Sequence, residues 1–179
     1  MEQLQIKLLS ENATLPTRNH STDAGFDIYA AETITLEPQE KALIATDIAV
    51  NIPKGYVGLL TSRSGVSSKT HLVIETGKID AGFTGNMKIN IKNDYISLEP
   101  FDKAEINIAD GGVIYPVYSI ENKLIRYSEE RENAVYQINK GDKLAQLVVV
   151  PIVTPELQQV EEFTSESARG EKGFGSSGF

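Results

Sequence analysis

The sequence contains no cysteine and only two histidines, His20 and His71, among its 179 residues. Without cysteine there is no disulfide, no thiolate metal site and no cysteine nucleophile. The two histidines stand too far apart in the chain to suggest a pair of metal ligands, and surface or packing roles are favoured for both. The sequence therefore excludes several familiar kinds of metal site and of covalent catalysis.

Basic residues are scarce as well: 17 Lys and Arg stand against 25 Asp and Glu, which gives a net charge of −8. Non-specific binding of duplex nucleic acid needs a basic face, so no direct nucleic-acid binding is expected. No apolar run approaches the roughly 20 residues that span a bilayer. The first nine residues also lack the basic start and apolar core of a secretory signal. We therefore expect a cytoplasmic protein. The net negative charge does not exclude binding of a small anionic ligand, because such a ligand needs only a few local donors or a metal ion.

What the sequence does contain is short apolar runs of β character. They lie at residues 4–9, 27–36, 41–52, 55–61, 71–79, 87–93, 135–138 and 143–153. These runs are rich in Val, Ile, Thr and Tyr, and turn formers such as PKG and NKGD separate them. Only the stretch after Gly65 suggests one or two helical turns. The pattern predicts a single all-β domain of the sandwich, jelly-roll or barrel type.

Residues 95–133 differ from the rest of the chain. This segment is locally charged and surrounds an apolar, aromatic stretch, IYPVY at residues 114–118. Its length predicts a surface insertion, and removing it is expected to let MKINIKN and VYQI pair as a hairpin. IYPVY reads as an exposed patch with the composition of an interface. The insertion either binds a partner or merely covers its own subunit.

The chain ends on RGEKGFGSSGF, a stretch that cannot hold a helix or a central strand because glycine loses so much backbone entropy on ordering. One interpretation is a frayed terminus. The other is a loop that closes over an anion with bare N–H groups and an arginine. The rest of the chain decides between them.

Five stretches interrupt the strands with glycine and polar residues. They are AGFDI (24–28), RSG (63–65), GKIDAGFTGN (77–86), GDKLAQL (141–147) and RGEKGFGSSG (169–178). Each alone is an ordinary turn or hairpin signal. In this order they resemble the five motifs of the trimeric dUTPases, from about residue 14 to the C-terminus apart from the insertion. The insertion resembles that of dUTPases from staphylococcal bacteriophages.

This resemblance implies an all-β jelly-roll subunit in a homotrimer with three shared active sites. Residues 1–163 would form the β domain, including the insertion at about 95–133, and residues 164–179 a flexible C-terminal lid. The implied reaction is hydrolysis of dUTP to dUMP and pyrophosphate with Mg²⁺, which keeps uracil out of DNA and supplies dUMP for dTMP synthesis. A phage-encoded enzyme would act in the host cytoplasm.

The resemblance also implies a role for each motif. Asp80 would deprotonate the water that attacks the α-phosphorus; taken alone, without the motif, it would be interpreted as a turn former before Gly82. Phe83 stands where the family usually has tyrosine; its ring would lie under the deoxyribose and exclude a 2′-hydroxyl. Backbone groups would read uracil in the hairpin that contains Gly77, Lys78, Ile79 and Lys88.

The phosphates would be bound by the remaining motifs. Arg63, Ser64 and Gly65 would hold the α- and β-phosphates, and Gln146, otherwise a strand-end amide, would contact the phosphates near the attacking water. Asp27 would hold Mg²⁺ through the water shell of the ion. In the tail, Phe174 would stack on uracil, and the γ-phosphate would be wrapped by Arg169, Gly175, Ser176 and Ser177. On this reading the tail is a catalytic lid.

Two other functions remain open. A dCTP deaminase shares the fold and the trimer, but would need a catalytic glutamate in the base pocket, and the FGSSG ending fits a dUTPase better. A regulatory binding protein that keeps the dUTPase frame is the alternative from another class. Because some staphylococcal phage dUTPases bind a pathogenicity-island repressor, such a repressor is the expected partner of the insertion, beside catalysis.

Overall fold

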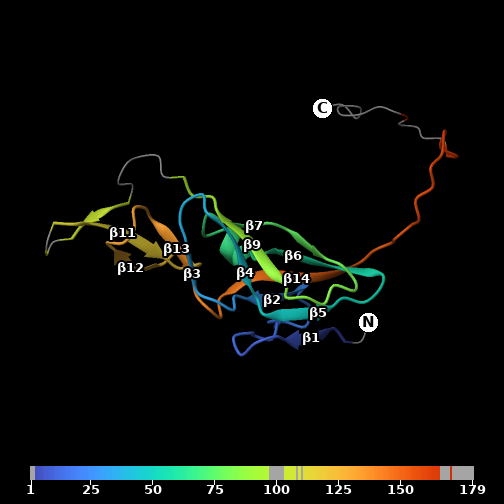
Figure 1. Cartoon of the computed structure of the whole chain (residues 1–179), viewed down its shortest axis with the longest axis horizontal. Helices are drawn as coiled ribbons and strands as arrows, with labels where there is room; N and C mark the ends of the chain where they lie inside the picture. The colour runs from blue at the N-terminus through green and yellow to red at the C-terminus, as the bar shows by residue number, and fades with distance from the viewer. Residues whose placement is uncertain (1–2, 97–102, 108, 110, 166–169, 171–179) are drawn as a thin grey trace.

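The strands lie where the apolar runs predict them. The computed structural model describes residues 3–96, 103–107, 109, 111–165 and 170 (Figure 1). Outside the insertion the strands are β1 (Gln5–Leu8), β2 (Gly25–Tyr29), β3 (Ile34–Leu36), β4 (Lys41–Ala45), β5 (Ile48–Asn51), β6 (Tyr56–Ser62), β7 (Leu72–Ile74), β8 (Gly77–Ile79), β9 (Lys88–Asn93), β13 (Val135–Ile138) and β14 (Lys143–Pro151). Among the described residues only α1 (Ser64–Ser67) is helical. The all-β prediction is confirmed.

Two sheets enclose the core. One has the strand order β2-β14-β6-β8 and the other the order β4-β9-β7. Alternation in β9 shows how the sequence produces the core, because Ile89 and Ile91 are fully buried while Lys88 points outward. These isoleucines join Ile28 of β2 and Leu147 of β14 in one apolar cluster. Burying this apolar surface is the main favourable contribution to folding.

The insertion adds three strands that its charged composition had hidden: β10 (Glu105–Ile106), β11 (Val113–Tyr118) and β12 (Leu124–Ser128). β11 pairs with β12 in antiparallel orientation and with β13 in parallel orientation, and β13 in turn pairs with β3. The insertion is thus attached to the body through an ordered sheet, seen at the β11, β12 and β13 labels in Figure 1.

Two expectations about this segment are wrong. The IYPVY stretch is not an exposed patch, because Tyr115 and Val117 are 7% and 0% exposed. The nearby Ile120 belongs to the main core cluster. MKINIKN and VYQI also lie in different sheets, β9 between β4 and β7 and β13 between β11 and β3, so the structure does not place them to form a hairpin. The centre of the IYPVY stretch is therefore buried rather than exposed.

In the described part of the chain, no helix has the length and apolarity needed to cross a membrane.

Candidate active site

Four of the five motifs meet in the β2-β14-β6-β8 sheet. Asp27 lies in β2, Gln146 in β14 and Gly77–Ile79 form β8, while RSG begins directly after β6. In the register of the sheet, Gln146 is opposite both Asp27 and Thr61. The motifs that contain Asp27, Arg63 and Gln146, of which the first and last are more than a hundred residues apart in sequence, therefore converge at one end of this sheet.

A buried carboxylate organises this end. Asp27 is 4% exposed, and its Oδ1 accepts a hydrogen bond from Arg63 Nε at 2.8 Å. Its Oδ2 lies 3.0 Å from Lys143 Nζ. Arg63 also donates from Nη1 to the carbonyl oxygen of Lys143 at 3.1 Å. Two cations and one anion leave a net positive charge in this cluster, which favours an anionic ligand.

The hydrogen bond to Asp27 also raises the pKa of Lys143 above its usual value, so this ammonium stays charged at neutral pH. Sequence reasoning missed Lys143, although it lies within the GDKLAQL motif. Its role depends on the register between β14 and β2, which no local pattern encodes.

A cavity of about 560 Å³ opens over this cluster. Its lining comes from the RSG helix, the start of β14 and the turn between β11 and β12: Arg63, Gly65, Val66, Lys69, Ser119, Ile120, Glu121, Gly141, Asp142 and Lys143. The volume is in the range of small-molecule sites. The insertion thus supplies one wall of a cavity that the phosphate-binding candidates also line.

Asp80 and Phe83 are joined by one tight turn. The Phe83 amide donates to the carbonyl oxygen of Asp80 at 3.1 Å, and Gly82 has a φ of +93°, a value suited to glycine. Asp80 is exposed and Phe83 is 44% exposed. The turn therefore fixes the candidate base and the candidate sugar-contacting ring relative to each other, and both are open to a ligand.

The loop that follows this turn is anchored to the body. Asn86 Nδ2 donates to Asp47 Oδ1 at 2.8 Å, and the Met87 amide donates to the carbonyl oxygen of Ile48 at 2.9 Å. Hydrogen bonds from Ser10 and Asn86 hold the pKa of Asp47 below its usual value. Asp47 therefore stays ionised and keeps the loop in place at neutral pH.

Within one chain, Asp80 lies far from the phosphate-binding candidates. Ile79 pairs with Gly58, whereas Arg63 lies five residues beyond Gly58 toward the opposite end of β6. At ~3.3 Å per residue this separation is about 17 Å. Lys78 of β8 and Lys88, the first residue of β9, are both exposed. The structure brings Asp27, Arg63 and Gln146 together, but not Asp80 with them.

The described residues contain no group of three or more His, Asp or Glu side chains that could hold a metal ion by themselves. An ionised carboxylate offers about four lone-pair sites, and Asp27 uses one on each oxygen for its two cations. Mg²⁺ commonly keeps several waters and takes other ligands from phosphates. The residues present therefore fit an ion that arrives with a nucleotide and contacts Asp27 through water.

The tail residues Arg169, Phe174, Gly175, Ser176 and Ser177 lie outside the described residues. The segment that leads toward them leaves β14 and runs away from the body (Figure 1). It carries exposed apolar side chains, with Val153, Leu157 and Phe163 between 89% and 101% exposed. A segment of this kind has its apolar surface free for another chain.

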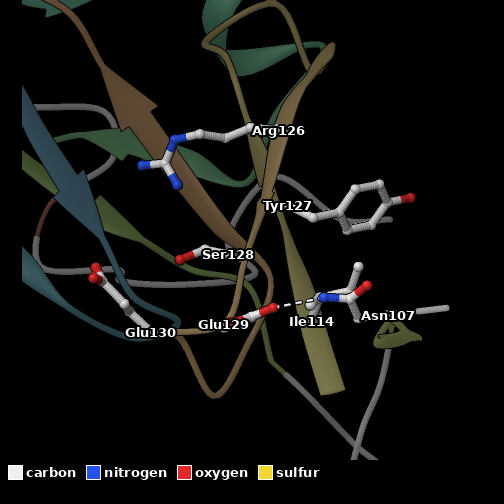
Figure 2. Close-up of a pocket in the computed structure, with 7 residues that line it drawn as sticks. All are labelled: Asn107, Ile114, Arg126, Tyr127, Ser128, Glu129 and Glu130. Atoms are coloured by element: carbon white, nitrogen blue, oxygen red, sulfur yellow. Dashed lines mark hydrogen bonds between the residues drawn. The ribbon is translucent and has the colours of Figure 1, made fainter. Parts of the chain in front are cut away.

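A second cavity, of about 510 Å³, lies in the insertion (Figure 2). It is lined by Asn107, Ile114, Arg126, Tyr127, Ser128, Glu129 and Glu130. Arg126 and Tyr127 point to opposite sides of β12, and Asn107 Nδ2 donates to Glu129 Oε1 at 2.7 Å. This cavity is separate from the one over Asp27 and shares no lining residue with it.

Comparisons with known proteins agree with the motif reading. A dUTPase family profile matches residues 11–102 and 103–178. The deoxyuridine 5'-triphosphate nucleotidohydrolase of Mycolicibacterium vanbaalenii is 33% identical over 181 residues, which cover 98% of this chain and 94% of that protein. The human mitochondrial enzyme is 32% identical over 98% of this chain, which spans only 55% of the human protein.

Solved structures from staphylococcal phages are more similar. The 80alpha dUTPase with dUpNHpp is 59% identical, with a TM-score of 0.85 and full coverage of both chains. The dUTPase of phage phi11 of S. aureus, described with a structural Mg(II) ion, is 61% identical over 92% of this chain with a TM-score of 0.78. These matches confirm the expected fold. The chain belongs to the dUTPase family, the enzymes that hydrolyse dUTP.

Proposed function

We propose that the chain hydrolyses dUTP to dUMP and pyrophosphate by attack of water on the α-phosphorus, with Mg²⁺ bound to the nucleotide. The convergence of Asp27, Arg63 and Gln146 in the sheet, beside the 560 Å³ cavity that Arg63 lines, carries the proposal. The 80alpha relative was solved with the nucleotide analogue dUpNHpp, and the phi11 relative with Mg(II). In the cell this reaction keeps uracil out of DNA and supplies dUMP, in the host cytoplasm if the chain is phage-encoded.

Asp80 is the proposed general base. Its side chain is exposed, so a water molecule can reach it, and a carboxylate is a suitable group to accept a proton from water. Phe83, held by the same turn, would stack against the deoxyribose. Backbone groups of Gly77–Ile79, with Lys88 on the returning strand, would read the uracil edge.

The α- and β-phosphates would be held at the opposite end of the same sheet in a second copy of the chain. Arg63 and Gln146 face this end, and Ser64 and Gly65 are exposed in the first turn of α1. Asp27 would hold the two cations in place and contact the water shell of Mg²⁺. The ion supplies the positive charge that lets a protein of net charge −8 bind a nucleoside triphosphate.

The separation within one chain supports the proposal of a shared site in a homotrimer. Asp80 must act at the α-phosphorus, while Arg63 must hold the α- and β-phosphates. Gly58, which pairs with Ile79 beside Asp80, is about 17 Å from Arg63 along the direction of β6. This separation supports the proposal that the two contacts come from different copies of the chain. The exposed apolar side chains of 152–163 favour packing on such a copy.

The tail would complete the site as a lid. Its predicted contacts are those of Phe174 with uracil and of Arg169, Gly175, Ser176 and Ser177 with the γ-phosphate. An arm that leaves the body before residue 164 is suited to reach another subunit.

Binding of a pathogenicity-island repressor through the insertion is a second proposed function. One relative is described as controlling transfer of virulence genes by a G protein-like mechanism. In this chain, Leu124 and Ile125 of β12 are 49% and 42% exposed next to the insertion cavity. Paired exposed aliphatic side chains beside a cavity are suited to a protein partner.

Pyrophosphate release from dUTP tests the catalytic proposal. Asp80→Asn keeps the size of the side chain but removes the base, so kcat should fall about 10²–10⁴-fold while dUTP still binds. Binding is measured by equilibrium titration of the variant. Near-normal turnover by the variant would place the base elsewhere. Incubation with dCTP is the control: ammonia release would identify a deaminase instead.

A further inference from the structure

The ring of Phe83 lies against the backbone of its own loop. A Cβ at Gly85 would come within 2.9 Å of Cζ and 3.1 Å of Cε2 of Phe83. Real Cβ atoms essentially never approach another heavy atom that closely. The ring therefore occupies space that is available only because residue 85 has no side chain.

Gly82 and Gly85 are glycines for different reasons. Gly82 has a φ of +93° with no heavy atom within 4 Å of its missing Cβ, so its backbone conformation demands glycine. Gly85 has a φ outside the left-handed region, and both closest atoms to its missing Cβ belong to the Phe83 ring. An alanine would fit the backbone conformation at position 85, and its methyl group would collide with the Phe83 ring.

The ring has room to respond. Phe83 is 44% exposed, so its side chain can rotate away from an added methyl group without disturbing a packed core. The turn from Asp80 is closed by a main-chain hydrogen bond, which such a rotation leaves intact. A methyl group at position 85 should thus move the ring and leave Asp80 in place.

We propose that Gly85 is a specificity-determining position, which acts by seating the Phe83 ring at the height and tilt where it supports a deoxyribose and blocks a ribose. The inference rests on the proposed contact of Phe83 with the sugar. It assigns to a residue that touches no substrate the control of how well the enzyme distinguishes dUTP from UTP.

The test compares kcat/KM for dUTP and UTP in Gly85→Ala. A misplacement of ~1 Å can cost about 100-fold in rate, so we expect the dUTP/UTP ratio to fall by at least about tenfold. The value of kcat/KM for dUTP should fall because the deoxyribose loses its contact with the ring. The value for UTP should rise relative to it because the displaced ring leaves space for the 2′-hydroxyl. Thr84→Ala changes the same loop without a methyl group under the ring, and should leave the ratio unchanged.

A double-mutant cycle with Phe83→Ala separates the possible results. Phe83→Ala should itself lower the ratio, and adding Gly85→Ala should then have no further effect, since no ring remains to be displaced. An unchanged ratio in Phe83→Ala would refute the sugar contact and the inference with it. If the dUTP/UTP ratio falls in Phe83→Ala but not in Gly85→Ala, the sugar contact stands and the role of Gly85 is refuted. The role of Gly85 is also refuted if Gly85→Ala lowers the ratio equally with and without the Phe83 ring.

Folding is checked by thermal denaturation of each variant. If Gly85→Ala does not fold, removing the ring in the double variant should restore folding, because the clash is then gone. Failure of the double variant as well would show that the backbone needs glycine at position 85, and would overturn the proposal.

Discussion

Asp142 carries an opposing charge into the cavity over Asp27. It is partly buried, and its Oδ2 accepts a hydrogen bond from the Asn139 amide at 2.8 Å. Burial raises the pKa of Asp142 above its usual value, despite this hydrogen bond, and the Glu121 charge adds to the effect. The folded chain therefore holds a proton on this carboxyl at a pH where the unfolded chain has released it.

This difference predicts a pH-dependent stability. As pH rises from the ordinary aspartate pKa of 3.8 through the raised one, the folded state binds more protons, so the free energy of unfolding contributed by this group decreases. Asp142→Asn removes the charge and keeps an oxygen for the Asn139 amide. We expect a higher melting temperature at pH 7 and a smaller gain near pH 3.5. A variant that is less stable at pH 7 than the parent protein would contradict this prediction.

The sequence indicated candidate residues for the site, but not how their side chains pair. Asp27, Arg63 and Gln146 could be selected from their motifs. That Arg63 and Lys143 would both bind Asp27 depends on the register of β14 against β2. Strand register arises from tertiary packing, so local sequence leaves it undetermined.

At the scale of elements, short alternating runs predicted the strands of the body because one face of each is buried. In the insertion this signal failed. β12 is exposed or partly exposed along its whole length, and β11 carries three consecutive buried residues, Tyr115, Pro116 and Val117. A buried run in a charged segment reads from sequence as an exposed patch. β11 pairs directly with β13 in parallel orientation, but β12 lies between the two strands in the sequence. A local sequence pattern therefore could not reveal this pairing.

The two strands of the insertion should therefore respond differently to truncation. Val117→Ala in β11 removes two methyl groups from a fully buried position, which should cost roughly 1–3 kcal/mol of unfolding free energy. Leu124→Ala in β12, at a half-exposed position, should change stability by no more than about 0.5 kcal/mol. Denaturant titration measures both.

The exposed residues of β12 also provide a test of repressor binding. Leu124→Ala should weaken binding of a purified pathogenicity-island repressor, measured by titration calorimetry, while dUTP hydrolysis stays unchanged. Unaltered repressor affinity in Leu124→Ala, Ile125→Ala and their double variant would remove β12 as the contact surface.

At the scale of the whole molecule, the separation of Asp80 from Arg63 predicts complementation between inactive chains. Asp80→Asn and Arg63→Gln should each be inactive alone. In a closed ring of three, any mixed trimer has one site with both residues intact, if they come from different chains. Random assembly of equal amounts makes about three-quarters of trimers mixed, so roughly a quarter of sites should work.

Activity is measured on the co-expressed and purified mixture, with mass spectrometry of intact trimers to show that mixing occurred. If Asp80 and Arg63 served the same site from one chain, every mixed trimer would stay at background. Recovery near a quarter supports the shared site.

The separation of about 17 Å along β6 between Gly58, the partner of Ile79, and Arg63 also affects how activity depends on the amount of enzyme. On this proposal, a free chain carries the Asp80 part of one site and the Arg63 part of another, but no complete site. On the proposed assembly, turnover per chain must fall on dilution, and at low concentration total activity should rise with nearly the cube of chain concentration. During synthesis, the first copies in a cell would be silent, and dUTP hydrolysis would begin only as their number grew.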